Sequence, residues 1–153
     1  MDAAALESAY RDIQSRIHPD RHAHAGDAQR RASMQWTTRV NEAYRTLKSP
    51  VQRAKYLLEL NGVDVAFETN TQMPAEFLTQ QLELREALAE AKEAGALDRL
   101  REQVRHDAGE LENGLRDLID LRRDFAAAAG LVRKLMFLHK LAEEIEQAYE
   151  EID

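Results

Sequence analysis

The chain has 153 residues, enough for one medium-sized domain or two small ones. With 44% hydrophobic and 32% charged residues but only six Gly and three Pro, it is expected to be water-soluble and largely helical. The absence of cysteine excludes disulfides and thiolate ligands and is typical of a cytoplasmic protein. The net charge of −7 argues against nucleic acid as the main partner, and no apolar run approaches the ~18 residues that span a membrane.

A short helix is predicted at the start of the chain, with Asp2 as its N-cap. Its apolar residues recur at intervals of three and four and form one stripe: Leu6, Tyr10, Ile13 and Ile17. Pro19 lacks an N–H and disfavours the helical conformation at His18, so the helix should end at or just before His18. The sequence therefore predicts an exposed, rigid corner at His18-Pro19-Asp20.

A second helix should follow a loop at residues 21–26, with Asp27 as its N-cap, and run over about residues 28–48. We expect its apolar face to pack against the first helix through Trp36, Val40, Ala43, Tyr44 and Leu47. Ser49-Pro50 is typical of a helix start, with Pro at the first helical position. That next helix should cover about residues 50–61 and end at Gly62.

The C-terminal half carries three apolar seams at helical spacing after Pro74, while residues 63–73 show no sustained period. Gly95 is expected to end or interrupt the first of these helices. Three amphipathic helices with short connections pack most simply as an antiparallel three-helix bundle. The seams are Phe77, Leu84, Leu88 and Ala91; Leu97, Leu100, Val104, Ala108, Leu111, Leu115 and Leu118; and Leu131, Leu135, Leu138, Ala142, Ile145 and Tyr149.

The predicted fold class is therefore all-α: a helical hairpin module over 1–62, a linker over 63–73 and a bundle over 74–153. The first 62 residues carry a charge balance of +3 and the rest a balance of −10. This asymmetry indicates two modules with different protein partners.

Three motifs in this order resemble a known family. The helix, His18-Pro19-Asp20, the loop and the helix ending at residues 41–47 (NEAYRTL) are similar to the J-domain of DnaJ-type co-chaperones. Residues 53–62 (RAKYLLELNG) and 77–86 (FLTQQLELRE) are similar to HscB, the J-type co-chaperone family of iron–sulfur cluster assembly. Because the chain has no cysteine, such a protein could not hold a cluster on its own thiolates.

The resemblance implies a function for the corner. In J-domains the equivalent residues trigger ATP hydrolysis by a DnaK-type chaperone, and that role would fall to His18, Pro19 and Asp20. Arg11, which shares a helical face with His18, and Arg21 would supply the positive surface that J-domains present to the ATPase.

The resemblance also implies that the J-domain-like hairpin lacks the first helix of the family. Relatives of HscB carry another helix upstream, packed against the hairpin. We therefore expect an uncovered apolar face around Tyr10, Trp36 and Tyr44, and a less stable module.

A second candidate surface lies on the first bundle helix. At 100° per residue, Leu78 and Leu82 fall outside the seam that contains Phe77. Exposed apolar residues rimmed by charge mark protein interfaces, although this pair could also cover the N-terminal module or widen the bundle core. In HscB-like proteins the matching surface binds the iron–sulfur scaffold protein. That role would fall to Leu78, Leu82, Glu83, Glu86 and Phe137. Phe137 is expected to lie outside the seam of the third helix. Thr79 is less apolar than the residue that the family resemblance leads us to expect at its position.

The combined interpretation is a co-chaperone that stimulates a DnaK-type ATPase and delivers the scaffold protein to it. No catalytic constellation and no Gly-rich phosphate loop occur, so we expect neither enzyme activity nor a cofactor. A J-domain adaptor for a different client is one alternative. Another is a metal-binding helical protein that uses His18, His22 and His24 with Asp20, although Pro19 breaks the helix that would align them. On the residues alone, the corner could also be a plain interhelical turn.

Overall fold

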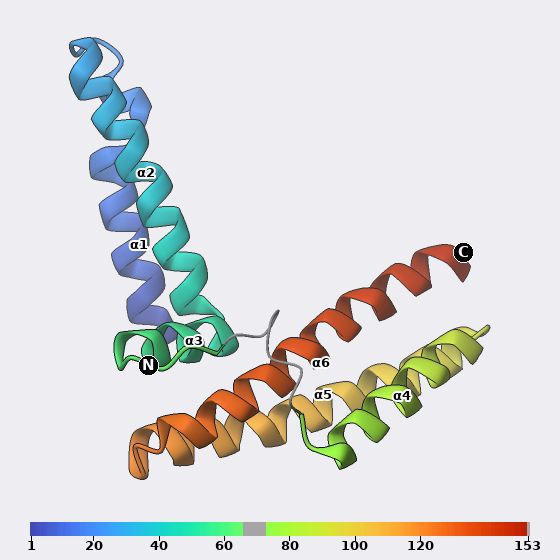
Figure 1. Ribbon diagram of the computed structural model, residues 1–153. Helices are drawn as coiled ribbons and strands as arrows, with labels where there is room; N and C mark the ends of the chain where they lie inside the picture. Colours follow the sequence, from blue (N-terminus) through green and yellow to red (C-terminus); the bar gives the residue numbers. More distant parts are fainter. Residues whose placement is uncertain (66–72, 153) are drawn as a thin grey trace. The chain divides into compact units, whose positions relative to one another are not determined.

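The computed structural model describes residues 1–65 and 73–152, and these contain helices and turns without strands (Figure 1). The all-α prediction is confirmed. The chain divides into two compact units, Met1–Tyr56 and Leu57–Asp153. The predicted linker, 63–73, lies for the most part outside the described residues. No described helix combines the length and apolarity needed to cross a membrane.

The first unit begins with α1 (Ala3–Ile17), whose ends follow the sequence signals. The Asp2 carboxylate accepts hydrogen bonds from the N–H groups of Ala4 and Ala5 at 3.0 and 3.1 Å, which confirms it as the N-cap. The helix ends at His18, whose N–H donates to the Gln14 carbonyl while its own backbone turns extended. The expected stop before Pro19 is confirmed.

The second long helix is α2 (Asp27–Lys48). Its N-cap is Gly26, so the prediction of Asp27 as the N-cap is wrong. Asp27 instead occupies the first turn, where its carboxylate pairs with Arg30 and lies favourably at the positive end of the helix dipole. The α2 helix therefore begins at Asp27, one residue earlier than predicted.

The third helix, α3 (Pro50–Leu60), starts as predicted, with the Gln52 N–H donating to the Ser49 hydroxyl. Gly62 follows its end at a φ of +78°, the left-handed conformation that glycine adopts without a steric penalty.

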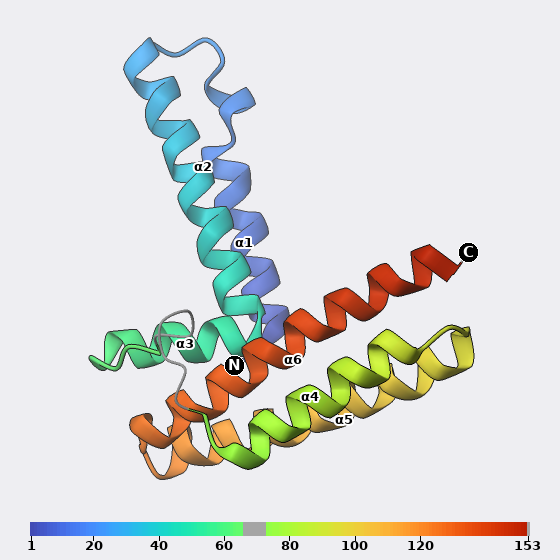
Figure 2. The ribbon, with the colours of Figure 1, turned by 45° about the vertical axis from the view of Figure 1, so that its right-hand side comes forward.

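The two long helices of the first unit run antiparallel and side by side (Figures 1 and 2). Near one end Tyr10 stacks on Tyr44, with ring centroids 4.0 Å apart. At the other end the buried Ser33 hydroxyl donates to the Ile17 carbonyl. Ser33 is the one described residue of α1 and α2 that is buried, so hydrogen bonds and aromatic stacking hold the pair where a large apolar core is absent.

The predicted contact face of α2 is partly wrong. Ala43 is exposed, and Trp36 is 61% exposed, which agrees with the uncovered apolar face expected around it but not with the expected contact with α1. The stripe that meets α1 is polar and lies further round the helix, through Ser33, Asn41 and Tyr44. Hydrogen-bonding groups, rather than the largest apolar residue, therefore set the rotation of α2.

Tyr44→Phe is expected to make the stability of the hairpin less sensitive to acid. The Tyr44 hydroxyl donates to Glu7 at 2.8 Å, and this bond is the main cause that lowers the pKa of the Glu7 carboxyl below its usual 4.5. A lowered folded-state pKa adds stability above the unfolded value and loses it as pH falls through the folded value. The advantage of the native chain over Tyr44→Phe should therefore shrink below pH 4.5, as measured by hydrogen exchange of α1 amides.

An NMR titration of the Glu7 carboxyl supplies the control, because its pKa should move toward 4.5 in Tyr44→Phe. A stability difference that stays constant through acid pH would contradict the assignment.

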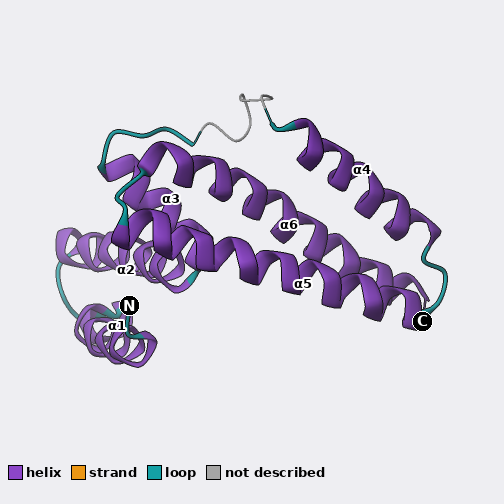
Figure 3. Cartoon of the chain, turned by 90° about the horizontal axis from the view of Figure 1, so that it is seen from below, coloured by secondary structure: helices purple, strands orange, loops and turns teal. Residues whose placement is uncertain are grey.

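The second unit contains the bundle of α4 (Ala75–Glu90), α5 (Ala94–Arg116) and α6 (Phe125–Ile152), with a π-helical turn η2 (Asp117–Leu121) after α5 (Figure 3). The α5 and α6 helices are antiparallel, since Arg101 lies 3.7 Å from Glu146 and a Cβ added at Gly114 would lie 3.0 Å from Leu131. The predicted three-helix bundle is confirmed. Its core contains Phe77, Leu84, Leu97, Leu100, Val104, Phe137, Leu138, Leu141 and Ile145.

The connections in the bundle differ from the prediction at one point. Gly95 does not end the first bundle helix but lies in the first turn of α5. The α4 helix ends at Glu90, where Ala91 turns extended. The chain reverses direction between α5 and α6, and Arg123 in this connection has a φ of +52°.

Candidate functional site

The His-Pro-Asp corner is an ordered turn that contacts α1 and α2 and leaves His18 and Asp20 exposed. Pro19 starts the 3₁₀ turn η1 (Pro19–His22), and the His18 ring caps it by accepting the Asp20 N–H at its Nδ1, 3.3 Å away. The Asp20 carboxylate lies 3.6 Å from the same nitrogen and its side chain is 94% exposed. The corner therefore presents a fixed imidazole beside a free carboxylate, which suits recognition by a basic surface.

Side chains of α2 hold the corner in place through the last residue of α1. The carbonyl of Ile17, the last residue of α1, accepts a hydrogen bond from the Ser33 hydroxyl, and Thr37 approaches the same oxygen at 3.5 Å. Helix ends leave such carbonyls without intrahelical partners. Ser33 was not a predicted site residue; the polar spacing of Ser33, Thr37 and Asn41 at four-residue intervals was the signal available in the sequence.

The two predicted arginines lie in different settings. The Arg21 guanidinium donates to the Ser15 carbonyl at 3.1 Å and so folds back over the C-terminus of α1, where a cation is favourable. Arg11 extends into solvent and pairs with Glu7 at 3.0 Å. Arg21 is thus part of the corner, whereas Arg11 lies almost two helical turns away on α1.

The histidines of the corner do not converge on one point. The His22 Nε2 lies 3.2 Å from the Arg16 carbonyl, while the His18 Nδ1 faces the backbone of Asp20. Within residues 1–65 and 73–152, the group of metal-ligand side chains that does come together is elsewhere, on α5. The residues of that group are His106, Asp107 and Glu110.

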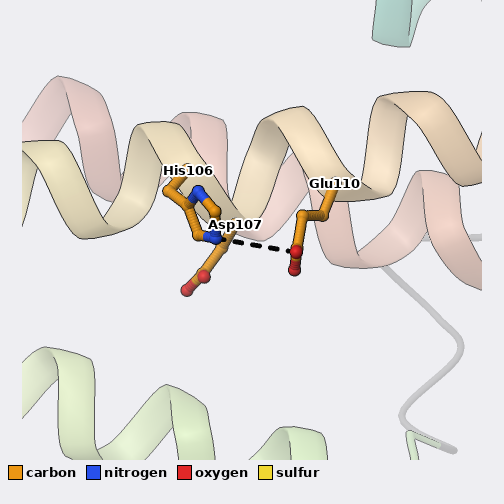
Figure 4. A group of neighbouring side chains, drawn as sticks. All are labelled: His106, Asp107 and Glu110. Carbon is orange, nitrogen blue, oxygen red and sulfur yellow. Dashed lines mark ion pairs between the residues drawn. The ribbon is translucent and has the colours of Figure 1, made fainter.

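Figure 4 shows the three side chains of the α5 group, which have structural roles. The two Asp107 carboxylate oxygens accept hydrogen bonds from the Gln80 and Gln103 amides at 3.0 and 2.9 Å. The exposed His106 lies 3.6 Å from Glu110 as a helical i, i+4 pair. Because Gln80 belongs to α4, Asp107 serves to tie α4 to α5.

The second predicted surface is an exposed strip on α4, formed by Leu78 and Leu82. Phe77 and Leu84 of the same helix point into the core. Leu78 and Leu82 remain 42% and 64% exposed, and Glu83 and Glu86 beside them are exposed as well. The α4 strip thus combines two exposed leucines with an acidic rim, an arrangement typical of an interface with another protein.

The prediction that Phe137 joins this strip is wrong. Its side chain is 5% exposed and packs edge-to-face on Phe77, with ring centroids 5.7 Å apart. The Arg85 guanidinium covers its ring at 5.3 Å and pairs with Glu144 at 2.9 Å. Since α6 packs against both α4 and α5, it buries a wider arc than the single seam predicted from its sequence. Phe137 therefore packs against α4 through Phe77 and Arg85.

Phe137→Ala is expected to destabilise the bundle by about 3–5 kcal/mol, because it removes a buried aromatic ring and leaves a cavity under α4. Urea unfolding followed by circular dichroism measures this loss. Leu121→Ala, at an exposed leucine of the same unit, should leave the free energy of unfolding within about 0.5 kcal/mol of the native value. Equal stability of the two variants would contradict the burial of Phe137.

Known proteins resemble the chain along its whole length. A family model described as the HSCB C-terminal oligomerisation domain matches residues 73–146. The co-chaperone protein HscB homologs of Ralstonia nicotianae and Aromatoleum aromaticum are 52% and 51% identical over 156 residues. Each alignment covers 100% of this chain, and 89% and 88% of the respective relative. The chain belongs to the HscB co-chaperone family.

Solved structures of HscB proteins share the fold. The chaperone HscB from Vibrio cholerae is 33% identical, with a TM-score of 0.86, over 100% of this chain and 91% of that one. The human co-chaperone protein HscB is 28% identical, with a TM-score of 0.91, over 96% of this chain and 74% of that one. The corner and the α4 strip are therefore features of an HscB co-chaperone.

Proposed function

We propose that the chain stimulates a DnaK-type ATPase chaperone and delivers the iron–sulfur scaffold protein to it in the cytoplasm. The observation that supports this most directly is the exposed His18-Pro19-Asp20 corner on a hairpin of an HscB-family chain. The ATPase activity belongs to the partner, and this chain supplies binding surfaces. The proposed client is the scaffold protein, which carries the cluster.

The corner acts by positioning fixed groups against the ATPase. The His18 cap and the Pro19 ring hold the turn, so little conformational entropy is lost when the partner binds. The free Asp20 carboxylate provides a charge-assisted acceptor for a partner Arg or Lys. Arg21, beside it at the end of α1, adds a positive charge toward an acidic part of the same partner.

The α4 strip acts by burying leucine surface against the scaffold. Leu78 and Leu82 give an i, i+4 apolar pair, while Glu83 and Glu86 favour a scaffold surface with basic groups at its edge. One chain that binds both proteins raises the effective concentration of the scaffold at the chaperone. The effective concentration rises even when the scaffold and the chaperone do not bind each other directly.

A steady-state ATPase assay with the cognate DnaK-type chaperone tests the proposal. We expect stimulation by the chain alone and a further increase when the scaffold protein is added. Stimulation without a scaffold-dependent increase would instead support a J-domain adaptor for a different client. The absence of any stimulation would refute the co-chaperone mechanism proposed for the corner.

We also propose that the bundle self-associates. The family model that matches residues 73–146 is described as an oligomerisation domain. In this chain α4 covers one side of the α5 and α6 pair, and a groove opens between α5 and α6. A concentration-dependent molar mass in analytical ultracentrifugation tests this property.

A further inference from the structure

The loop that carries the His-Pro-Asp corner is held by hydrogen bonds rather than by burial. Each of residues 18–26 is exposed or half-buried, and none of them is buried. A loop with few buried apolar contacts opens at a low cost in free energy, and ordering its backbone costs conformational entropy. The fixed orientation of the corner therefore depends on polar contacts between the loop and the helices beside it.

These polar contacts converge on the C-terminal end of α1. The last carbonyls of a helix have no partner within the helix, so donors from outside can bind there. In α1 the last three carbonyls are each contacted by a polar side chain from outside the helix, two from η1 and one from α2. The Ser15 carbonyl accepts from the Arg21 guanidinium at 3.1 Å, the Arg16 carbonyl lies 3.2 Å from the His22 Nε2, and the Ile17 carbonyl accepts from the Ser33 hydroxyl.

His22 is the donor whose geometry constrains the loop most. A carbonyl oxygen can only accept, so the His22 Nε2 must carry the hydrogen that points toward the Arg16 carbonyl. The imidazole is a rigid, half-buried ring, whereas the Arg21 guanidinium stands at the end of a long chain with more rotamer freedom. The His22 carbonyl also accepts the Ala25 N–H at 3.0 Å, so His22 both ends η1 and begins the turn toward α2.

We propose that His22 is a positioning residue, which fixes the orientation of the His18-Pro19-Asp20 corner relative to α1. The inference rests on the proposed function, because it gives His22 a part in the stimulation of the DnaK-type ATPase. The Arg16 carbonyl occupies its Nε2, so His22 acts through the corner. Without this hydrogen bond the corner holds the productive orientation for a smaller fraction of the time. The apparent affinity for the chaperone falls by that fraction, while the bound complex is unchanged.

The test is a titration of the cognate chaperone with the full chain in the steady-state ATPase assay. His22→Phe keeps a flat ring and removes the donor. The chain concentration at half-maximal stimulation should rise about fivefold, as expected for the loss of one hydrogen bond, while maximal stimulation stays at the native level. His22→Gln places an amide N–H within reach of the same carbonyl, so it should restore the half-maximal concentration to within about twofold of the native value.

His24→Phe is the matched control, because it makes the same substitution in the same loop at an exposed residue beyond η1. It should keep the native half-maximal concentration, and all three variants should keep the native circular dichroism spectrum. A second measurement tests the contact without the chaperone. Heteronuclear NMR of the imidazole nitrogens at alkaline pH, where imidazoles are neutral, should place the His22 hydrogen on Nε2. The opposite tautomer would overturn the hydrogen bond to Arg16.

The assay also separates this role from the proposed function. If the native chain stimulates the ATPase but His22→Phe titrates like the native chain, or His24→Phe shows an equal rise, the role of His22 is overturned and the proposed function stands. A fall in maximal stimulation in His22→Phe would assign His22 to direct contact with the ATPase and so overturn positioning. A native chain that gives no stimulation would refute the proposed function and the role of His22 with it.

Discussion

His18→Gln is expected to reduce the stimulation of the DnaK-type ATPase by roughly thirtyfold or more, the loss typical of a central interface residue. The imidazole has two roles in the corner: its Nδ1 accepts the Asp20 N–H at 3.3 Å, and it lies 3.6 Å from the Asp20 carboxylate. Glutamine is flexible where the imidazole is rigid, so the turn loses its cap at the Asp20 N–H. Steady-state phosphate release at saturating ATP measures the effect.

His24→Gln is the matched control, because His24 is exposed in the same loop and lies after the turn that His18 caps. It should retain the stimulation of the native chain, and both variants should keep the native circular dichroism spectrum. Equal losses in the two variants would show that the overall charge of the loop, rather than the corner, is responsible for the stimulation of the ATPase. Scaffold affinity should be unchanged in both, since His18 lies outside the bundle.

The double variant Leu78→Ala/Leu82→Ala is expected to weaken binding of the scaffold protein by roughly a hundredfold, equivalent to about 3 kcal/mol of lost apolar burial. Both leucines are largely exposed, so their truncation should leave the free energy of unfolding almost unchanged. Isothermal titration calorimetry with the cognate scaffold protein measures the affinity. The heat-capacity change of binding should also become less negative, because less apolar surface is buried.

Leu121→Ala controls for the removal of an exposed leucine elsewhere in the same unit. It should leave the scaffold affinity at the native value. In the ATPase assay the leucine double variant should keep the basal stimulation and lose the scaffold-dependent increase. Native scaffold affinity in the double variant would refute the α4 strip as the binding surface.

Several short-range signals in the sequence were reliable, although the local predictions at Asp27 and Gly95 failed. Pro19 ends α1 because it lacks an N–H, and Asp2 caps the helix because its carboxylate reaches the free N–H groups of the first turn. Gly62 occupies the left-handed position that follows α3. The exposed leucines of α4 were likewise predictable, since 100° per residue separates them from Phe77.

Predictions failed where burial depended on a neighbouring helix. Trp36 was expected to face α1, yet the hydrogen bonds of Ser33 and Tyr44 to α1 rotate α2 so that Trp36 faces solvent. Phe137 was expected to be exposed, yet α4 and the Arg85 side chain cover it. A prediction from a single apolar seam assumes that a helix packs against one neighbour, whereas α6 packs against both α4 and α5.

The amino-acid sequence by itself determined the helices, the stop at Pro19 and the two leucines that give α4 a second apolar face. These features depend on backbone geometry and on contacts within a few residues along the chain. The tertiary structure alone decided that Ser33 anchors the corner, that Phe137 packs against α4, and that a groove opens between α5 and α6. Each of these depends on which faces of separate helices meet, and periodicity along one helix carries no information about the rotation of its neighbours.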